Sequence, residues 1–277
     1  MRPPILFIIL LLSSHKITAQ VIADNQLNCR IEPSMEVQLS SPVVGIIEEV
    51  LVDKNAQVER GQVVARLEDD LETATVALRK ALAKQTSQIE AQQLQFNFTK
   101  RSLKRVNDLY KKKAASYAEL DKAKTEHAIA AQQLQQAKDQ KQRAQLEYRR
   151  SEVDLARRTI TTPISGTVVE RFKQPGEHID FEPVLKIVHL NPLKVTAYGP
   201  ASLFGEIKIG MKARVSPILG NKKHTHQAEV TMVDPVIDGA SGTIGIELSL
   251  KNPDNRIPSG LKCTISFPGV SLNLLDR

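Results

Sequence analysis

Glycine and proline are missing from one long stretch of the chain. Of the 277 residues, 13 are Gly and 14 are Pro, but neither occurs between Gln62 and Thr162. This stretch is rich in Ala, Gln, Lys, Glu, Leu and Arg, which favour helices. A helical pattern of that length without breakers is typical of a coiled coil. On either side, Gly and Pro recur as they do where strands alternate with turns.

Aromatic residues and cysteines are also scarce. The chain has no Trp, 4% aromatic residues and two cysteines. So few large side chains argue against one large core and predict an elongated molecule with several small cores. Cys29 and Cys263 either form a disulfide, which an oxidising compartment would permit, or stand as two separate buried thiols.

Signatures of catalysis and of cofactor binding are missing as well. The sequence has no nucleophile elbow, no Gly-rich phosphate loop and no cluster of metal ligands. His224 and His226 would lie on one face of a strand, but no third ligand is evident nearby, so we expect an exposed polar turn there. We therefore predict a protein without enzymatic activity, cofactor or metal.

The first 19 residues have the layout of a secretory signal peptide. Arg2 precedes an apolar run from Ile5 to Leu12, and the small residue Ala19 offers a cleavage point. This run is too short to cross a bilayer core, which takes about 20 residues, so a retained anchor is the weaker alternative. Cleavage also removes Lys16 and lowers the formal net charge from +7 to +5. Export and so mild a charge argue against nucleic acid as a partner.

Apolar or small side chains recur at most positions spaced seven residues apart in the helical stretch. Two neighbouring rows of this kind run over residues 75–110 and 78–106, and two more, in a different frame, run over residues 120–155 and 123–151. Large residues in one row beside small ones in the next fit coiled-coil packing. We therefore predict two helices of about 40 residues, about 60 Å long, that pack antiparallel as a hairpin.

The change of frame marks the turn between the two helices. Ser116 is suited to cap the second helix, and Glu119, three residues later, completes the sequence pattern of a capping box. Lys111, Lys112 and Lys113 come just before, where cations complement the dipole at the C-terminal end of the first helix.

A strand–turn–strand pattern occurs twice, once on either side of the helical stretch. "SSPVVGIIEEVLVDKNAQVERGQVVARL" begins at Ser40 and "TTPISGTVVERFKQPGEHIDFEPVLKIV" begins at Thr161, so the copies align without a gap at an offset of 121 residues. A unit of about 28 residues cannot bury its own hydrophobic face. We therefore predict that the copies stack about a pseudo-twofold axis as the halves of one β-domain.

The two half-motifs resemble the halves of a biotinyl/lipoyl domain. Carrier proteins of that family join the halves at a tight turn with a modified lysine between methionines, but no Met-Lys-Met sequence occurs here. A lipoyl-like domain split by a long α-hairpin instead resembles the HlyD-like periplasmic adaptor proteins, or membrane fusion proteins, of RND-type tripartite efflux pumps. The part of the chain after His189 resembles the β-barrel domain of these adaptors. The resemblance there lies in "NPDNRIPSGL" and in Asp234, Pro235, Asp238, Gly242 and Thr243.

The resemblance implies an α+β fold whose parts follow in a fixed order. They are a signal peptide (1–19), an N-terminal strand segment that joins the barrel (20–39), the first lipoyl half (40–67), the α-hairpin (68–158) with its tip near 110–118, the second lipoyl half (159–189), the β-barrel (190–268) and a C-terminal tail (269–277). The membrane-proximal domain of the family is expected to be absent or rudimentary, so a second adaptor could be needed in its place.

The resemblance also implies where such a protein contacts its channel. Adaptors of RND pumps mark the hairpin tip with an Arg, a Leu four residues later and a Ser seven residues after that, and Arg105, Leu109 and Ser116 have this spacing. An Arg can bind carbonyls or carboxylates of a partner, and a Leu can fill a groove between helices. The alternative is that Leu109 packs beside the seam and that Ser116 is only a cap. Residues 111–113 could add an electrostatic attraction.

The implied function is that of a periplasmic adaptor subunit in a Gram-negative bacterium. It would link an inner-membrane transporter of RND type to a TolC-type outer-membrane channel for the efflux of small molecules such as drugs, and it would self-associate as a hexamer. Alternatives are an adaptor of an ABC-type efflux or type I protein secretion system, a lipoyl or biotin carrier, and a structural coiled-coil protein. The sequence does not identify the transported substrate.

Overall fold

The computed structural model describes residues 26–219 and 224–270, so the predicted signal peptide lies outside the described residues. The chain divides into two compact units. One comprises residues 35–190, and the other combines the residues up to 34 with those from 191 onward. Helices and strands occur together as predicted for the α+β class, and each unit has its own core.

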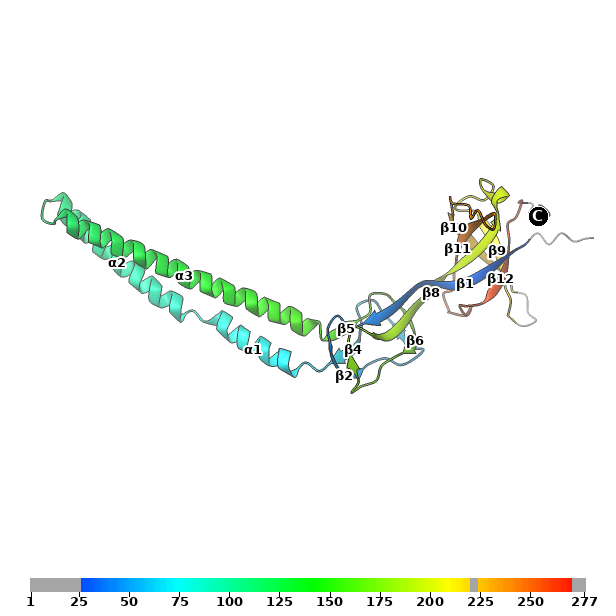
Figure 1. Cartoon of the computed structure of the whole chain (residues 1–277), viewed down its shortest axis with the longest axis horizontal. Coiled ribbons are helices and arrows are strands. Elements are labelled where there is room, and N and C mark those ends of the chain that lie inside the picture. The colour runs from blue at the N-terminus through cyan, green and yellow to red at the C-terminus, as the bar shows by residue number, and fades with distance from the viewer. Residues whose placement is uncertain (1–25, 220–223, 271–277) are drawn as a thin grey trace, which may run out of the picture. The chain divides into compact units, whose positions relative to one another are not determined.

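Three helices form the hairpin of the unit that comprises residues 35–190 (Figure 1). They are α1 (Asp70–Lys84), α2 (Ser87–Lys111) and α3 (Tyr117–Ala156). α1 and α2 follow one another along the same side of α3. The outgoing arm is therefore interrupted at Gln85 and Thr86, and the prediction of one continuous helix of about 40 residues is wrong there.

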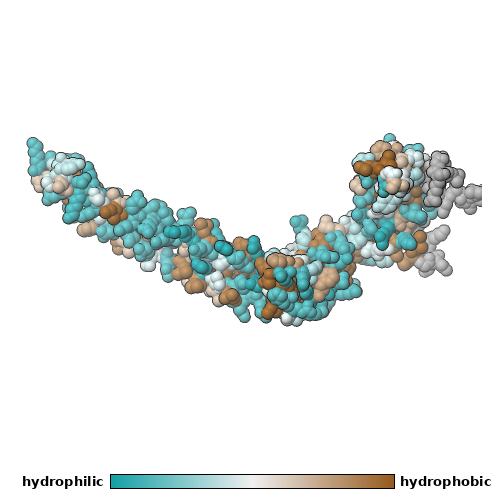
Figure 2. All heavy atoms as spheres, in the orientation of Figure 1, coloured by the Kyte–Doolittle hydropathy of each residue, from teal (hydrophilic) through white to brown (hydrophobic). Residues whose placement is uncertain are grey.

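The interruption changes which side chains of the outgoing arm are covered. On α1, Val76 is half-buried and Ala83 is buried. The seven-residue spacing places Leu78 and Leu82 in the packed rows, but Leu78 is 60% exposed and Leu82 is 41% exposed. Gln85 has an extended backbone (φ −62°, ψ 132°). One non-helical residue is enough to rotate the next helix about its axis, so the rows of α2 do not continue through α1. Figure 2 shows separate hydrophobic spots on an otherwise hydrophilic hairpin surface.

The packing between α2 and α3 follows the predicted rows. Thr99 is buried on α2, and its Oγ1 lies 3.2 Å from Nδ1 of His127 on α3. The His127 ring in turn lies 4.8 Å from the ring of Phe96. The buried residues of α3 all belong to the two predicted rows: Leu120, Ala123, Ala130, Leu134, Ala137 and Ser151. Alternation of leucine with alanine lets the two helices pack closely, as in a coiled coil.

The β-domain of the same unit reproduces the sequence repeat strand by strand. The first copy supplies β2 (Gly45–Val50), β3 (Gln57–Val58) and β4 (Val63–Leu67), and the second supplies β6 (Gly166–Arg171), β7 (His178–Ile179) and the beginning of β8 (Pro183–Pro200). β2 pairs with β7, and β6 pairs with β3, so each half takes one strand from the other. This exchange confirms the predicted stacking about a pseudo-twofold axis. The short β5 (Thr159–Thr161) pairs with β4.

Side-chain contacts obey the same symmetry. Ser41 accepts the N–H of Val43 and donates its hydroxyl to the Val43 carbonyl, and Thr162 does the same with Ile164, at the offset of 121 residues. Neither half could bury its apolar face alone, but together they form one core. Its buried members come from both copies and include Ile47, Val58, Val64, Leu67, Val168, Ile179, Val184, Leu185 and Ile187.

The second unit is a β-barrel. Its strands are β1 (Leu27–Ser40), β12 (Lys262–Ser266), β9 (Lys212–Pro217), β10 (His226–Val233), β11 (Thr243–Leu250) and the later part of β8, in this spatial order, and pairing of β1 with β8 closes the ring. A 3-10 turn (Ala201–Leu203) follows β8. Side chains alternate in and out along β11, where Ile244, Ile246, Leu248 and Leu250 are buried. β1 and β8 contribute residues to both units.

Candidate functional site at the hairpin tip

The first helix of the tip ends in a hydrogen-bonded turn. The N–H of Lys113 donates to the Tyr110 carbonyl at 2.9 Å, and the N–H of Ala114 donates to the Leu109 carbonyl at 2.9 Å. These two bonds define a Schellman motif. Lys113 therefore adopts the left-handed backbone conformation, with φ of 60°, at a position that usually holds Gly. The sequence gives no signal for this turn, because it offers no Gly there.

The second helix of the tip begins with the predicted capping box. The Ser116 hydroxyl accepts the N–H of Glu119 at 3.2 Å. In return the Glu119 carboxylate accepts the N–H of Ser116 at 2.7 Å and its hydroxyl at 2.9 Å. The backbone bond, and then the side-chain bond, from Ser116 hold the pKa of Glu119 below its ordinary value. The rings of Tyr110 and Tyr117 meet edge to face across the turn at 6.4 Å. Both ends of the tip thus have defined geometry.

The residues expected to contact a channel lie on or close to this turn. Arg105 is exposed on α2 one turn before Leu109, which is 46% exposed, and Ser116 is the N-cap of α3. Residues 111–113 are exposed in the same turn. Leu109 therefore has apolar surface exposed at the tip. Contact of any of these residues with a channel stays a prediction.

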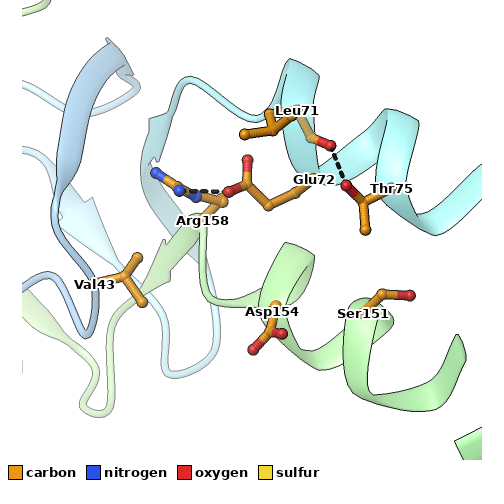
Figure 3. Close-up of a pocket in the computed structure, with 7 residues that line it drawn as sticks. All are labelled: Val43, Leu71, Glu72, Thr75, Ser151, Asp154 and Arg158. Carbon is orange, nitrogen blue, oxygen red and sulfur yellow. Dashed lines mark hydrogen bonds and ion pairs between the residues drawn. The ribbon is translucent and has the colours of Figure 1, made fainter. Parts of the chain in front are cut away.

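A second feature, which the sequence did not reveal, is a pocket of about 340 Å³ where the hairpin meets the β-domain. It is lined by Val43, Leu71, Glu72, Thr75, Ser151, Asp154 and Arg158. Figure 3 shows the Arg158 guanidinium directed at Glu72 of α1, to which it is bonded at 2.5 Å, and the same guanidinium also donates to the Val44 carbonyl at 3.2 Å. Arg158 thus joins α1 to the first β-half. We interpret the pocket as part of this joint, because its only cation is already engaged.

The two cysteines are paired in the barrel unit, to which the two histidines also belong. Cys29 on β1 and Cys263 on β12 lie opposite one another in register, with Cα atoms 4.8 Å apart, and form a disulfide.

His224 and His226 line a largely apolar pocket of about 290 Å³ in the barrel unit. Across the described parts of the chain, no three His, Cys, Asp or Glu side chains come close enough to hold a metal ion.

The segment from Asp234 to Gly242, which resembles the adaptors' barrel domain in sequence, forms the loop between β10 and β11. The Asp238 carboxylate accepts the N–H groups of Ser241 at 3.1 Å and Ala240 at 2.8 Å, and these bonds lower its pKa. Asp234 accepts the N–H of Val236 at 2.9 Å in the same way, and Gly242 has a φ of 65°. These hydrogen bonds therefore stabilise the loop.

No helix within residues 26–219 and 224–270 is both long enough and apolar enough to span a membrane.

Comparison with known proteins gives distant relatives. No family model matches the chain. A UPF0194 membrane protein of Yersinia pseudotuberculosis is 23% identical over 84% of this chain and 86% of that protein. A UPF0194 membrane protein of Acidithiobacillus ferridurans is 27% identical over 143 residues, which cover 46% of this chain and only 42% of the relative.

Solved structures show the same fold. MacA from Actinobacillus actinomycetemcomitans matches with a TM-score of 0.76 and 22% identity, over 87% of this chain and 76% of that one. The membrane fusion protein Spr0693 from Streptococcus pneumoniae matches with a TM-score of 0.62 and 14% identity, over 87% and 97%. The chain therefore has the fold of these two proteins, with a helical hairpin between two lipoyl-like halves and a β-barrel.

Proposed function

We propose that this protein is a non-enzymatic periplasmic adaptor that connects an inner-membrane transporter to a TolC-type outer-membrane channel. One observation carries the proposal: a long helical hairpin with a defined, exposed tip replaces the turn that joins the two lipoyl-like halves. A carrier protein would need a modified lysine at that point, whereas a hairpin extends a contact surface away from the β-domain. The protein holds its partners together, and the energy for transport comes from the transporter.

The finer assignment is efflux of small molecules by a transporter of RND type. The spacing of Arg105, Leu109 and Ser116 supports it, because all three lie at the tip as adaptors of RND pumps require. An ABC-type transporter or a type I secretion system is the second candidate, since the adaptor fold serves efflux and secretion alike. Purification of the native complex tests the choice: recovery of an ATP-binding subunit would contradict the RND assignment.

The proposal includes the compartment and the assembly. After cleavage of its signal peptide the protein would lie in the periplasm of a Gram-negative bacterium, held at the inner membrane by its transporter. Copies would associate side by side into a hexamer. Leucines left uncovered on the outgoing arm, such as Leu78 and Leu82, offer apolar surface for this packing.

Substitutions at the tip test the function. Arg105→Asp and Leu109→Asp should each abolish drug resistance in a strain that depends on this protein, because both remove a contact with the channel. Leu146→Asp and Arg149→Asp are matched controls on α3 far from the tip, since Leu146 is 54% exposed and Arg149 is exposed. Circular dichroism should give the same helix content for all four variants. Full resistance in both tip variants would contradict the proposed contact.

A further inference from the structure

Positive charge is concentrated next to the hairpin tip. Residues 100–113 contain seven Lys and Arg and a single Asp, while the whole chain has a formal net charge of only +7. All seven cations are exposed. None of them forms an ion pair with any residue that the structure describes, although ten such pairs occur elsewhere. The remainder of the chain is therefore almost neutral, and the tip is the place where a charged partner would be recognised.

Four of the seven cations share one face of α2. Lys100, Arg101, Lys104 and Arg105 follow the i, i+4 spacing that places residues on one helix face, whereas Leu103 between them is half-buried toward α3. Lys111, Lys112 and Lys113 continue the charge around the end of α2. At 1.5 Å per residue this surface, which we name the cationic tip face, is about 20 Å long.

The helix dipole accounts for only part of this charge. Its effect on a cation falls off within the last helical turn, so it applies to Lys111 and Lys112 but not to Lys100 or Arg101. Lys113 lies beyond the helix and holds a left-handed backbone (φ 60°), where Gly would fit the turn without steric cost. Such strain in an exposed residue points to a use for its side chain.

We propose that the cationic tip face binds a carboxylate-rich surface on the periplasmic end of the partner channel. This inference rests on the proposed function and adds the chemistry of the partner. Arginines can bind carboxylates through two parallel hydrogen bonds, and the lysines act as point charges that steer the encounter. A protein surface is favoured over an anionic lipid, because exposed Leu109 and Tyr117 accompany the charges on a turn that hydrogen bonds fix at both ends.

The test compares two triple variants of equal charge loss in the full-length mature protein. One changes Lys111, Lys112 and Lys113 to Gln. The control changes three exposed lysines of the same hairpin far from the tip to Gln: Lys80, Lys84 and Lys138. The probe is the purified TolC-type channel of the same bacterium in detergent micelles, immobilised for interferometry at 0.05–1 M NaCl. We expect the tip variant to associate about tenfold more slowly at the lowest salt concentration, and the difference to vanish at 1 M, where charges are screened within about 3 Å.

The outcomes of the experiment distinguish failure of this inference from failure of the proposed function. Binding of the channel that is equally fast for both variants and independent of salt would overturn the acidic partner while leaving the proposed function intact. Failure of the unmodified protein to bind the channel at any salt concentration would overturn both. Binding to phosphatidylglycerol vesicles that depends on the tip lysines, without such dependence for the channel, would assign the face to a lipid and also overturn the inference. Lys113→Arg should bind like the native chain, whereas Lys113→Gly should bind more slowly.

Discussion

Two glycines at equivalent positions of the repeat allow a direct test of how the β-domain is packed. Gly45 begins β2 and Gly166 begins β6, yet their surroundings differ. A Cβ atom at residue 166 would lie 2.3 Å from the carbonyl oxygen of Val188, which is backbone of the neighbouring strand. A Cβ atom at residue 45 would lie 2.7 Å from Nη1 of Arg158, the far end of a flexible side chain. The same substitution should therefore have different costs in the two halves.

The magnitudes follow from what has to move. Carbon and oxygen in weak contact normally stand about 3.3–3.6 Å apart, so Gly166→Ala must push β6 away from β8 by about 1 Å, where Thr167 pairs with Val188. We expect this to lower the free energy of unfolding by about 3 kcal/mol or more, the upper range for overpacking. In Gly45→Ala the arginine side chain can turn aside, at the expense of one hydrogen bond to Val44, which is worth about 1 kcal/mol.

Scanning calorimetry of the two variants measures this difference. For a unit of this size 1 kcal/mol shifts Tm by about 2–4 °C, so the transition of the β-domain should fall by about 6–12 °C for Gly166→Ala and by about 2–4 °C for Gly45→Ala. Helix content by circular dichroism serves as the control for an intact hairpin. Equal shifts for the two variants would refute the reasoning, because they would mean that the backbone yields at residue 166 as easily as a side chain does at residue 45.

Four further predictions concern the tip and the barrel. Ser116→Ala removes the cap of α3 and should cost about 1 kcal/mol, seen as faster amide exchange in the first turn of that helix. The pKa of Glu119 is lower in the folded protein than its ordinary value of 4.5, so the ionised carboxylate stabilises the fold at pH values above 4.5. This stabilisation is lost as the pH falls through the pKa of the folded state. Urea unfolding at a series of pH values should show the loss for the native chain and not for Glu119→Gln. Lys113→Gly should raise the unfolding free energy by about 1 kcal/mol, as relief of a left-handed conformation, and an unchanged or lower value would contradict that strain. Reduction of the Cys29–Cys263 disulfide should cost the barrel about 2–5 kcal/mol in urea unfolding, and Cys29→Ala should abolish this sensitivity to reductant.

The repeat and the coiled-coil rows could be read from the sequence because each has a fixed spacing. Strands of the two halves begin at Gly45 and Gly166, at the predicted offset, since alternating apolar residues bury one face of a strand and cannot slip by one position. The capping box could be predicted because Ser116 and Glu119 form a purely local pattern. These are features in which neighbouring residues determine the backbone.

The remaining features depend on contacts that the sequence does not record. The interruption at Gln85 carries no Gly or Pro, and the left-handed Lys113 occupies a place where only Gly would have been a signal. Whether Cys29 pairs with Cys263 depends on the register of β1 against β12, which no local pattern determines. The joint at Arg158 unites segments far apart in the chain. The candidate tip could therefore be located in advance, but not its strained turn.

The central claim is that the hairpin tip contacts the outer-membrane channel. Photocrosslinking in living cells tests it most directly, with a benzophenone amino acid placed at residue 109 of the tip or at residue 146, an exposed control position on α3. The account predicts an adduct between this protein and the TolC-type channel from residue 109, and no channel adduct from residue 146. Export-competent cells that yield no channel adduct from residue 109 would contradict the account.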